Sequence, residues 1–314
     1  MTLASALVSN PTLFLGFVAL LGLLVGSFIN VIVYRLPIML ERAWQSSELP
    51  TEAFNLAVPR SHCPSCAQQL SASENVPVVS FLFLRGRCRH CKSRISARYP
   101  LVEIAASVAS ILVAMTFGFT ASTLAFLAFA WFLLALSLID LDHHLLPDDL
   151  TLPLLWLGLL VSAFNLGLPG VSLFDAVIGA AAGYMTLWSL FWAFLLVTGK
   201  EGLGYGDFKL LAALGAWLGW QAILPVLLLA SLAGAVIGLI LIVFGGRERS
   251  APLPFGPFFS RRWFCHANLG TASSRSVWDA LCAALDRYIE AISAKKKVQG
   301  SRKQRIKRDP KTRL

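Results

Sequence analysis

Two aspartates lie at the ends of apolar segments, where a membrane helix would meet water. Asp140 closes the apolar run 124–139, and Asp207 ends the sequence Gly-Tyr-Gly-Asp just before a second run, 210–220. An ionisable group at membrane depth is costly and is therefore read as functional by default. Two such carboxyls suit acid/base work on water: one takes a proton from water, and the other, protonated, polarises a carbonyl and then protonates the leaving amine. The pair predicts peptide hydrolysis.

The residue pattern leaves other interpretations open for these acids. Four aspartates, Asp140, Asp142, Asp148 and Asp149, lie within ten residues, and spacing alone does not select one; Asp140 is continuous with the apolar run. Asp148 and Asp149 precede a new apolar run, which favours helix capping. Asp207 could likewise cap the helix that follows it. Ion or proton transport through the same acids is the alternative to catalysis.

Residues around Asp207 could support a catalytic loop. Gly204 and Gly206 free the backbone to bring the carboxylate into an unusual position, although a lone G-x-G-D is a weak motif. Lys209 could tune the two acids or hold a substrate carboxylate, and an interfacial lysine that snorkels toward water is the plainer alternative.

Composition indicates an all-α polytopic membrane protein. The 314 residues are 56% hydrophobic and 14% charged, with a mean hydropathy of +0.68. Runs near the ~20 residues that cross a bilayer predict about seven transmembrane helices: 13–34, 101–117, 122–139, 152–168, 176–197, 210–220 and 223–244. The sixth run is short, and the alternative is one tilted helix plus a re-entrant piece over 208–246.

Basic residues predict the orientation. No Lys or Arg precedes the first run, whereas 35–100 contains nine, which places the N-terminus outside and this loop in the cytoplasm. Because successive spans cross the membrane in opposite directions, Asp140 and Asp207 are then both placed at the cytoplasmic face. The net charge of +10 does not indicate nucleic-acid binding, because 16 of the basic residues lie at 247–314, where a tail beside anionic lipid accounts for them.

Two C-x-x-C pairs lie in the predicted cytoplasmic loop. Cys63 and Cys66 form the first, and Cys88 and Cys91 form the second. Reducing conditions discourage structural disulfides there, so four thiolates around one structural Zn(II) are expected, with a redox pair as the alternative. A closed four-ligand site would fold a loop that has few apolar residues of its own.

Several motifs occur in order along residues 12–258 and together resemble the type IV prepilin peptidases. They are Gly26-Ser-Phe-Ile-Asn30-Val-x-x-x-Arg35-Leu-Pro37, the two C-x-x-C pairs, Arg98-Tyr-Pro100-x-x-Glu103, Ile139-Asp-x-Asp-x-x-x-Leu-Pro-Asp148, Thr198-Gly-Lys-Glu-Gly-x-Gly204-Tyr-Gly-Asp207-x-Lys209 and Pro254-Phe-Gly-Pro257. The resemblance implies a multi-pass enzyme of the bacterial inner membrane with a periplasmic N-terminus. Its catalytic aspartates would be Asp140 and Asp207, facing the cytoplasm.

The resemblance also implies substrates and a cofactor. Prepilins and pseudopilins would lose a short basic leader, and the new N-terminal amine would be methylated with S-adenosylmethionine as donor. The residues that bind this donor are not visible in the sequence, because no glycine-rich nucleotide loop follows a strand. Glu103 could contact the substrate amine or the donor, or serve as an acid near a helix N-terminus.

Four segments follow: an N-terminal transmembrane helix at 1–34, the cysteine loop at 35–100, a helical protease core at 101–257 and a polar basic tail at 258–314. The tail departs from the family, whose members usually continue into an eighth span. An amphipathic helix at 277–292 is expected in it, and a frameshifted end is the alternative. An inactive family member is therefore a third hypothesis, beside the protease and the transporter.

Overall fold

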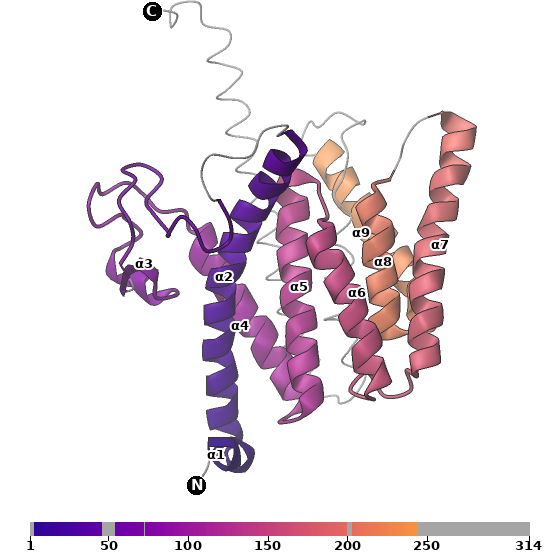
Figure 1. The fold of residues 1–314 in the computed structure, drawn as a ribbon, viewed down its shortest axis with the longest axis horizontal. Coiled ribbons are helices and arrows are strands. Elements are labelled where there is room, and N and C mark those ends of the chain that lie inside the picture. The colour runs from indigo at the N-terminus through magenta and orange to yellow at the C-terminus, as the bar shows by residue number, and fades with distance from the viewer. Residues whose placement is uncertain (1–2, 46–53, 72, 200–202, 244–314) are drawn as a thin grey trace, which may run out of the picture. The chain divides into compact units, whose positions relative to one another are not determined.

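The fold is built from helices that follow the apolar runs. The computed structural model describes the backbone of residues 3–45, 54–71, 73–199 and 203–243, so the predicted tail at 258–314 lies outside the described residues. Within those residues β pairing is limited to two isolated bridges. The helices are α1 (Leu3–Ser9), α2 (Pro11–Gln45), η1 (Ser73–Asn75), α3 (Val79–Phe83), α4 (Arg98–Phe117), α5 (Ala121–His143), α6 (Asp148–Ala163), α7 (Leu173–Thr198), α8 (Tyr205–Leu218), η2 (Trp220–Ala222) and α9 (Ile223–Val243) (Figure 1).

Each of the seven predicted runs contains a helix, although α6 ends at Ala163, before the end of the predicted run 152–168. Four of the described helices, α2, α4, α5 and α7, are long and apolar enough to cross a bilayer, so the chain is a multi-pass membrane protein. Of the other apolar helices, α9 has 21 residues, whereas α6 and α8 have 16 and 14. At about 1.5 Å per residue, α8 extends roughly 21 Å. The first helix also differs from the prediction, because α2 continues through Pro37 to Gln45 instead of ending with its apolar run.

Glycines allow two pairs of helices to approach closely. On α2, a Cβ added to Gly26 would lie 2.7 Å from the Glu103 Cα of α4. On α7, added Cβ atoms at Gly179 and Gly183 would lie 2.3 Å from the Gly215 carbonyl oxygen and 2.6 Å from the Leu211 carbonyl oxygen of α8. The Gly-x-x-x-Gly spacing of Gly179 and Gly183 is of the kind that allows two helices to pack closely.

An aromatic core joins α5, α6 and α8. The buried Trp217 ring of α8 lies 4.6 Å from the Phe129 ring and 5.4 Å from the Phe126 ring of α5, centroid to centroid. Its indole Nε1 donates a hydrogen bond to the Leu154 carbonyl of α6 at 2.8 Å. This core fixes the C-terminal end of α8 against the first half of α5.

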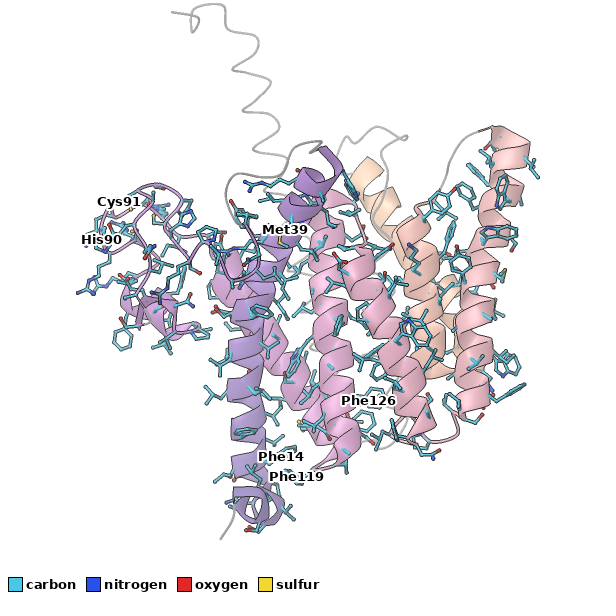
Figure 2. All side chains as sticks on the ribbon, viewed as in Figure 1. Phe14, Met39, His90, Cys91, Phe119 and Phe126 are labelled. Atoms are coloured by element: carbon cyan, nitrogen blue, oxygen red, sulfur yellow. The ribbon has the colours of Figure 1, made fainter. Side chains whose placement is uncertain are left out.

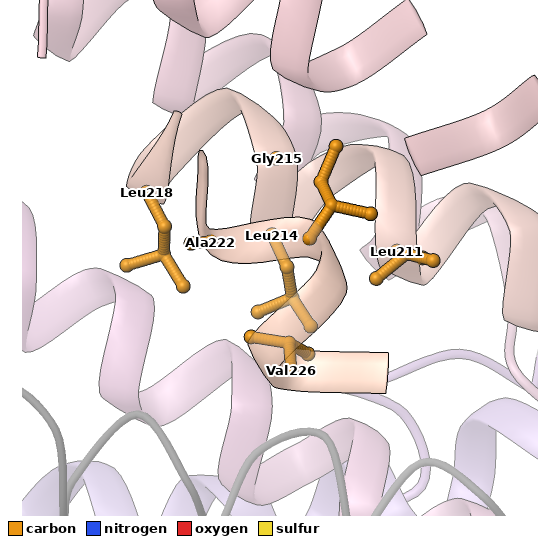
Figure 3. Close-up of a pocket in the computed structure, with 7 residues that line it drawn as sticks. Leu211, Leu214, Gly215, Leu218, Ala222 and Val226 are labelled. Atoms are coloured by element: carbon orange, nitrogen blue, oxygen red, sulfur yellow. The ribbon is translucent and has the colours of Figure 1, made fainter. Parts of the chain in front are cut away.

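A depression between α8 and α9 is lined by apolar side chains and is too small to hold a water molecule (Figure 3). Its walls come from the middle and end of α8, around Leu211 and Leu218, and from Val226 of α9. Its lining contains no group that could act on a substrate.

Candidate active site and metal centre

Asp140 and Asp207 lie at the same end of two antiparallel helices. Trp217, near the C-terminus of α8, packs on Phe126 and Phe129, near the N-terminus of α5. Counted from this contact, Asp140 lies about 16 to 21 Å toward the C-terminus of α5, and Asp207 lies about 15 Å toward the N-terminus of α8. Because the two helices are antiparallel, both directions lead to the same end. Both residues are buried, Asp140 with 5% and Asp207 with 9% of its surface exposed.

A backbone contact fastens the start of α8 to the segment that follows α5. A Cβ added to Gly206 would lie 2.6 Å from the Leu146 Cβ and 3.1 Å from the Leu146 carbonyl oxygen, so only glycine fits without displacement. Gly206 precedes Asp207, and Leu146 follows Asp140 by six residues. The contact therefore confirms the antiparallel arrangement and holds the two acidic segments together.

Asp207 also stabilises its own helix terminus. Its Oδ2 accepts a hydrogen bond from the Gly204 N–H at 3.3 Å, in the position of a residue that closes a capping box. The capping alternative considered from the sequence is thus realised. The second carboxylate oxygen, Oδ1, is not used in this bond, so capping and chemistry are compatible at this residue.

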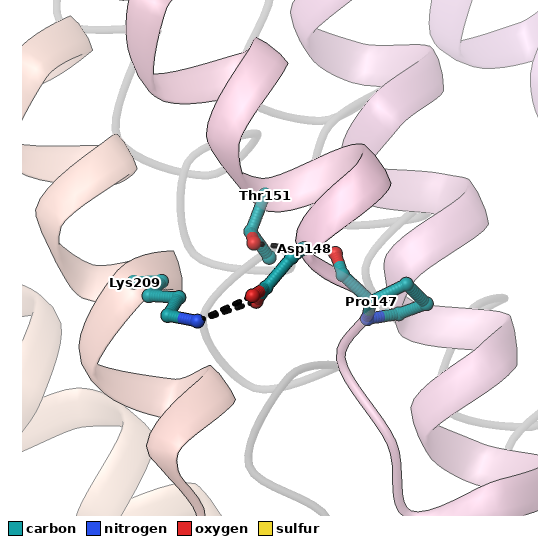
Figure 4. A network of polar contacts seen from close by, with 4 residues as sticks. All are labelled: Pro147, Asp148, Thr151 and Lys209. Carbon is teal, nitrogen blue, oxygen red and sulfur yellow. Dashed lines mark hydrogen bonds and ion pairs between the residues drawn. The ribbon is translucent and has the colours of Figure 1, made fainter. Parts of the chain in front are cut away.

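An ion pair joins α6 to α8 beside this site. Lys209 Nζ lies 2.6 Å from both carboxylate oxygens of Asp148, the first residue of α6 (Figure 4). The Thr151 hydroxyl donates to the Pro147 carbonyl at 3.2 Å in the same turn. Lys209 therefore pairs with Asp148, which was one of the four aspartates that spacing alone left as candidates for the catalytic acid.

The structure distinguishes the four aspartates that spacing alone does not. Asp142 forms an ion pair with Arg98 at the start of α4, Asp148 binds Lys209, and Asp149 is exposed. Asp140 is the buried member of the four. Its carbonyl accepts the His144 N–H at 2.9 Å, where His144 ends α5 in a left-handed conformation.

The four cysteines converge in the loop between α2 and α4. Their sulfur atoms all lie within 4.8 Å of one another (Cys91 is labelled in Figure 2). The two C-x-x-C pairs fold alike: the Cys63 N–H donates to the Gln68 carbonyl at 2.9 Å, and the Cys88 N–H donates to the Ser93 carbonyl at 2.8 Å. Two turns of the same geometry thus present two sulfur atoms each.

This geometry fits a tetrahedral metal. With Zn–S bonds of about 2.3 Å, the sulfur atoms of a zinc tetrathiolate are about 3.8 Å apart, and Cys63 Sγ lies 3.8 Å from Cys91 Sγ. Backbone N–H groups of Ser65 and Cys66 lower the pKa of Cys63 to about 6. A hydrogen bond from the Gln68 N–H lowers the pKa of Cys66, but desolvation and the neighbouring sulfur atoms together raise it to about 11. A bound cation would favour the thiolate form of Cys66.

Two buried charged residues attach the cysteine loop to the helices. Arg35 of α2 donates from Nη1 to the Asn55 carbonyl at 2.9 Å and from Nη2 to the Pro59 carbonyl at 2.5 Å. Glu103 of α4 accepts the Val78 N–H at 2.7 Å through Oε2. The sequence gives no signal for these partners, because both contacts join charged side chains to backbone atoms of distant loop residues.

Comparison with known proteins identifies two domain families in order. Residues 20–117 match the bacterial peptidase A24 N-terminal domain, and residues 127–239 match the type IV leader peptidase family. These ranges contain the cysteine loop and both buried aspartates. No solved structure matches the chain.

Curated relatives are similar over most of their length. A protein of Aeromonas salmonicida named prepilin leader peptidase/N-methyltransferase is 57% identical over 261 residues, which cover 80% of this chain and 89% of the relative. Proteins of the same name from Stutzerimonas stutzeri and Pseudomonas aeruginosa are 53% and 51% identical over 269 residues, covering 83% of this chain and 92% of each relative.

Proposed function

This chain belongs to the type IV leader peptidase family, and we propose that it removes the leader of prepilins with Asp140 and Asp207 as its catalytic pair. The observation that supports this assignment is the burial of both aspartates at one end of antiparallel α5 and α8. The enzyme is a prepilin peptidase with N-methyltransferase activity, as its relatives are named.

The proposed hydrolysis uses two carboxyls in different protonation states. Two nearby carboxyls do not both ionise readily because like charges repel. The ionised one takes a proton from water as the oxygen attacks the scissile carbonyl carbon. The protonated one donates a hydrogen bond to that carbonyl and then passes its proton to the leaving amine. Burial strengthens both interactions because it excludes bulk water from the polar groups.

The surrounding contacts would hold this pair in place. Gly206 against Leu146 sets the distance between the acidic segments, and the Lys209–Asp148 ion pair ties α8 to α6. Positioning of this kind matters because an error of about 1 Å in reacting groups can cost about 100-fold in rate. In this proposal Gly204 and Gly206 support the catalytic loop.

Seven spans in the bacterial inner membrane, with the N-terminus in the periplasm, are part of the proposal. Helices over all seven apolar runs and the basic residues of 35–100 support this topology. With it, the acids and the cysteine loop face the cytoplasm, the compartment in which a basic leader would be found.

A structural Zn(II) held by Cys63, Cys66, Cys88 and Cys91 is supported by the 3.8 Å sulfur separation and the paired turns. The metal would stabilise the fold of the loop and takes no part in cleavage. S-adenosylmethionine would supply the methyl group for the new amine. The G-x-G segment at 204–206 does not fit its binding, because Leu146 fills the space beside Gly206.

A cleavage assay tests the proposed function. Purified protein in detergent is incubated with a prepilin and labelled S-adenosylmethionine, and a shortened, methylated product is expected. Asp140→Asn and Asp207→Asn should each abolish shortening while the protein stays folded, whereas Asp149→Asn, at an exposed neighbouring acid, should cleave at near wild-type rate. Acid-dependent ion flux without a product would favour the transporter hypothesis. Absence of any product from the intact wild-type chain would favour an inactive member.

A further inference from the structure

The short helix α3 in the cysteine loop and the residues just before it expose a cluster of large apolar side chains. Phe83 is 85% exposed, Leu82 is 67% exposed, and Val79 and Val76 are 45% and 42% exposed. A soluble surface tolerates scattered apolar residues, but a contiguous exposed group of this kind marks an interaction site.

The exposure does not result from a loosely folded loop. Phe81 turns inward, and a Cβ added to Gly86 would lie 3.0 Å from its ring atom Cζ. The Gly86 N–H donates to the Phe81 carbonyl at 2.9 Å, and the Arg85 N–H donates to the Leu82 carbonyl at 3.0 Å. These hydrogen bonds hold the turn that follows α3 in place, with Phe81 facing inward and Leu82 and Phe83 facing outward.

Attachment to α4 places α3 at the level of the membrane boundary. The Val78 N–H, just before α3, donates to the Glu103 carboxylate at 2.7 Å. Glu103 lies five residues into α4, about 7.5 Å along a helix that is apolar enough to span the bilayer. In the shared view of Figures 1 and 2, α3 lies toward one end of the loop and His90 toward the other.

Basic residues follow this apolar cluster in the sequence. The segment 54–100 contains seven Lys and Arg residues and a single carboxylate, Glu74. That carboxylate is engaged by Ser71, whose N–H and hydroxyl both donate to Glu74 Oε2 at 2.8 Å. Arg85, Arg87 and Arg89, which follow α3 directly, are exposed. Apolar side chains bordered by arginines are the combination that binds the interface of an anionic membrane.

We propose that α3 is a membrane anchor: Leu82 and Phe83 insert into the cytoplasmic leaflet, and Arg85, Arg87 and Arg89 bind the phosphates of anionic lipids. The anchor holds the cysteine loop against the bilayer beside the start of α4. A protein that binds the apolar cluster is less favoured than lipid, because the cluster is attached to a membrane-spanning helix and the charged residues that follow it are all basic.

Photo-crosslinking in lipid nanodiscs tests this proposal on the full-length protein. p-Benzoylphenylalanine replaces Phe83 in one preparation and His90, at the far end of the loop, in the matched control. Irradiation in discs that contain phosphatidylglycerol should yield lipid adducts at position 83 and at least fivefold fewer at position 90. Equal yields at the two positions, or crosslinks from position 83 to protein instead of lipid, would overturn the proposal.

The arginines are tested by charge removal in the same crosslinking background. Arg85→Gln combined with Arg87→Gln should lower the adduct yield at position 83 by about fivefold or more in phosphatidylglycerol discs, and little in phosphatidylcholine discs. An unchanged yield in both lipids would refute their role. A monodisperse elution profile for each variant establishes that folding is retained.

Discussion

The contact of Gly206 with Leu146 provides a sharp test of how the acidic segments are positioned. An alanine Cβ at position 206 would lie 2.6 Å from the Leu146 Cβ, whereas ordinary contacts begin near 3.4 Å. The start of α8 must therefore shift by about 0.8 Å, and Asp207 is the next residue. Both atoms are attached directly to backbone, so a rotamer change does not relieve the overlap.

Because this displacement moves Asp207, Gly206→Ala should lower kcat/KM for leader cleavage by about 30- to 100-fold. An error of about 1 Å in the position of a catalytic group lowers the rate by about 100-fold. Overpacking should also lower the free energy of unfolding by about 1 to 3 kcal/mol. The rate is measured by the appearance of shortened prepilin, and stability is measured by thermal unfolding in the same detergent.

Gly204→Ala is the matched comparison, because the two glycines lie in one motif. At Gly204 the backbone is extended, with φ −82° and ψ 144°, and an added Cβ would lie 3.4 Å from its nearest neighbour, Asp207 Oδ2. This substitution should cost about 1 kcal/mol or less, the effect of alanine at a helix N-cap. Similar activity in Gly204→Ala and Gly206→Ala would refute the positioning argument.

Five further substitutions test the metal centre, the Lys209–Asp148 ion pair and the Glu103 contact. Cys63→Ser should reduce bound zinc from about one per chain to near zero and speed amide exchange in the loop; wild-type protein without zinc, purified in the absence of chelators, would contradict this. Lys209→Met and Asp148→Ala should each cost about 1 kcal/mol or less, because the pair is partly exposed, and a double-mutant cycle with a larger coupling would be unexpected. Glu103→Ala should cost about 1 to 3 kcal/mol by leaving the Val78 N–H unpaired, whereas Glu103→Gln retains an acceptor; equal losses would argue against that bond.

The sequence predicts well what depends on local composition. A helix forms in each of the seven apolar runs, because such segments must satisfy their own backbone hydrogen bonds in lipid. The convergence of the four cysteines is also confirmed, because each C-x-x-C pair fixes two ligands within one turn. The predicted length of the first helix is too short, because an apolar run indicates only the part of a helix that lies in the membrane. In the structure α2 continues to Gln45, and the Arg42 guanidinium carbon lies 4.3 Å from the Phe54 ring centroid.

What depends on contacts between distant segments could not be predicted. Spacing alone does not choose among the four aspartates; in the structure Asp142 and Asp148 form ion pairs with Arg98 and Lys209, and Asp140 is the buried one. The two partners of each pair come from different helices. The role of Glu103 is likewise invisible in its own segment, because its partner is the backbone of Val78.

The central claim, that Asp140 and Asp207 act together on one water, is tested most directly by an experimental structure with an inhibitor bound. The inhibitor is a prepilin leader peptide in which a hydroxyethylene group replaces the scissile amide and mimics the tetrahedral intermediate. If the two aspartates share one water, the inhibitor's hydroxyl should lie within hydrogen-bond distance, about 2.5 to 3.0 Å, of a carboxylate oxygen from each aspartate. A hydroxyl that contacts only one of them, or binds elsewhere in the protein, would contradict it.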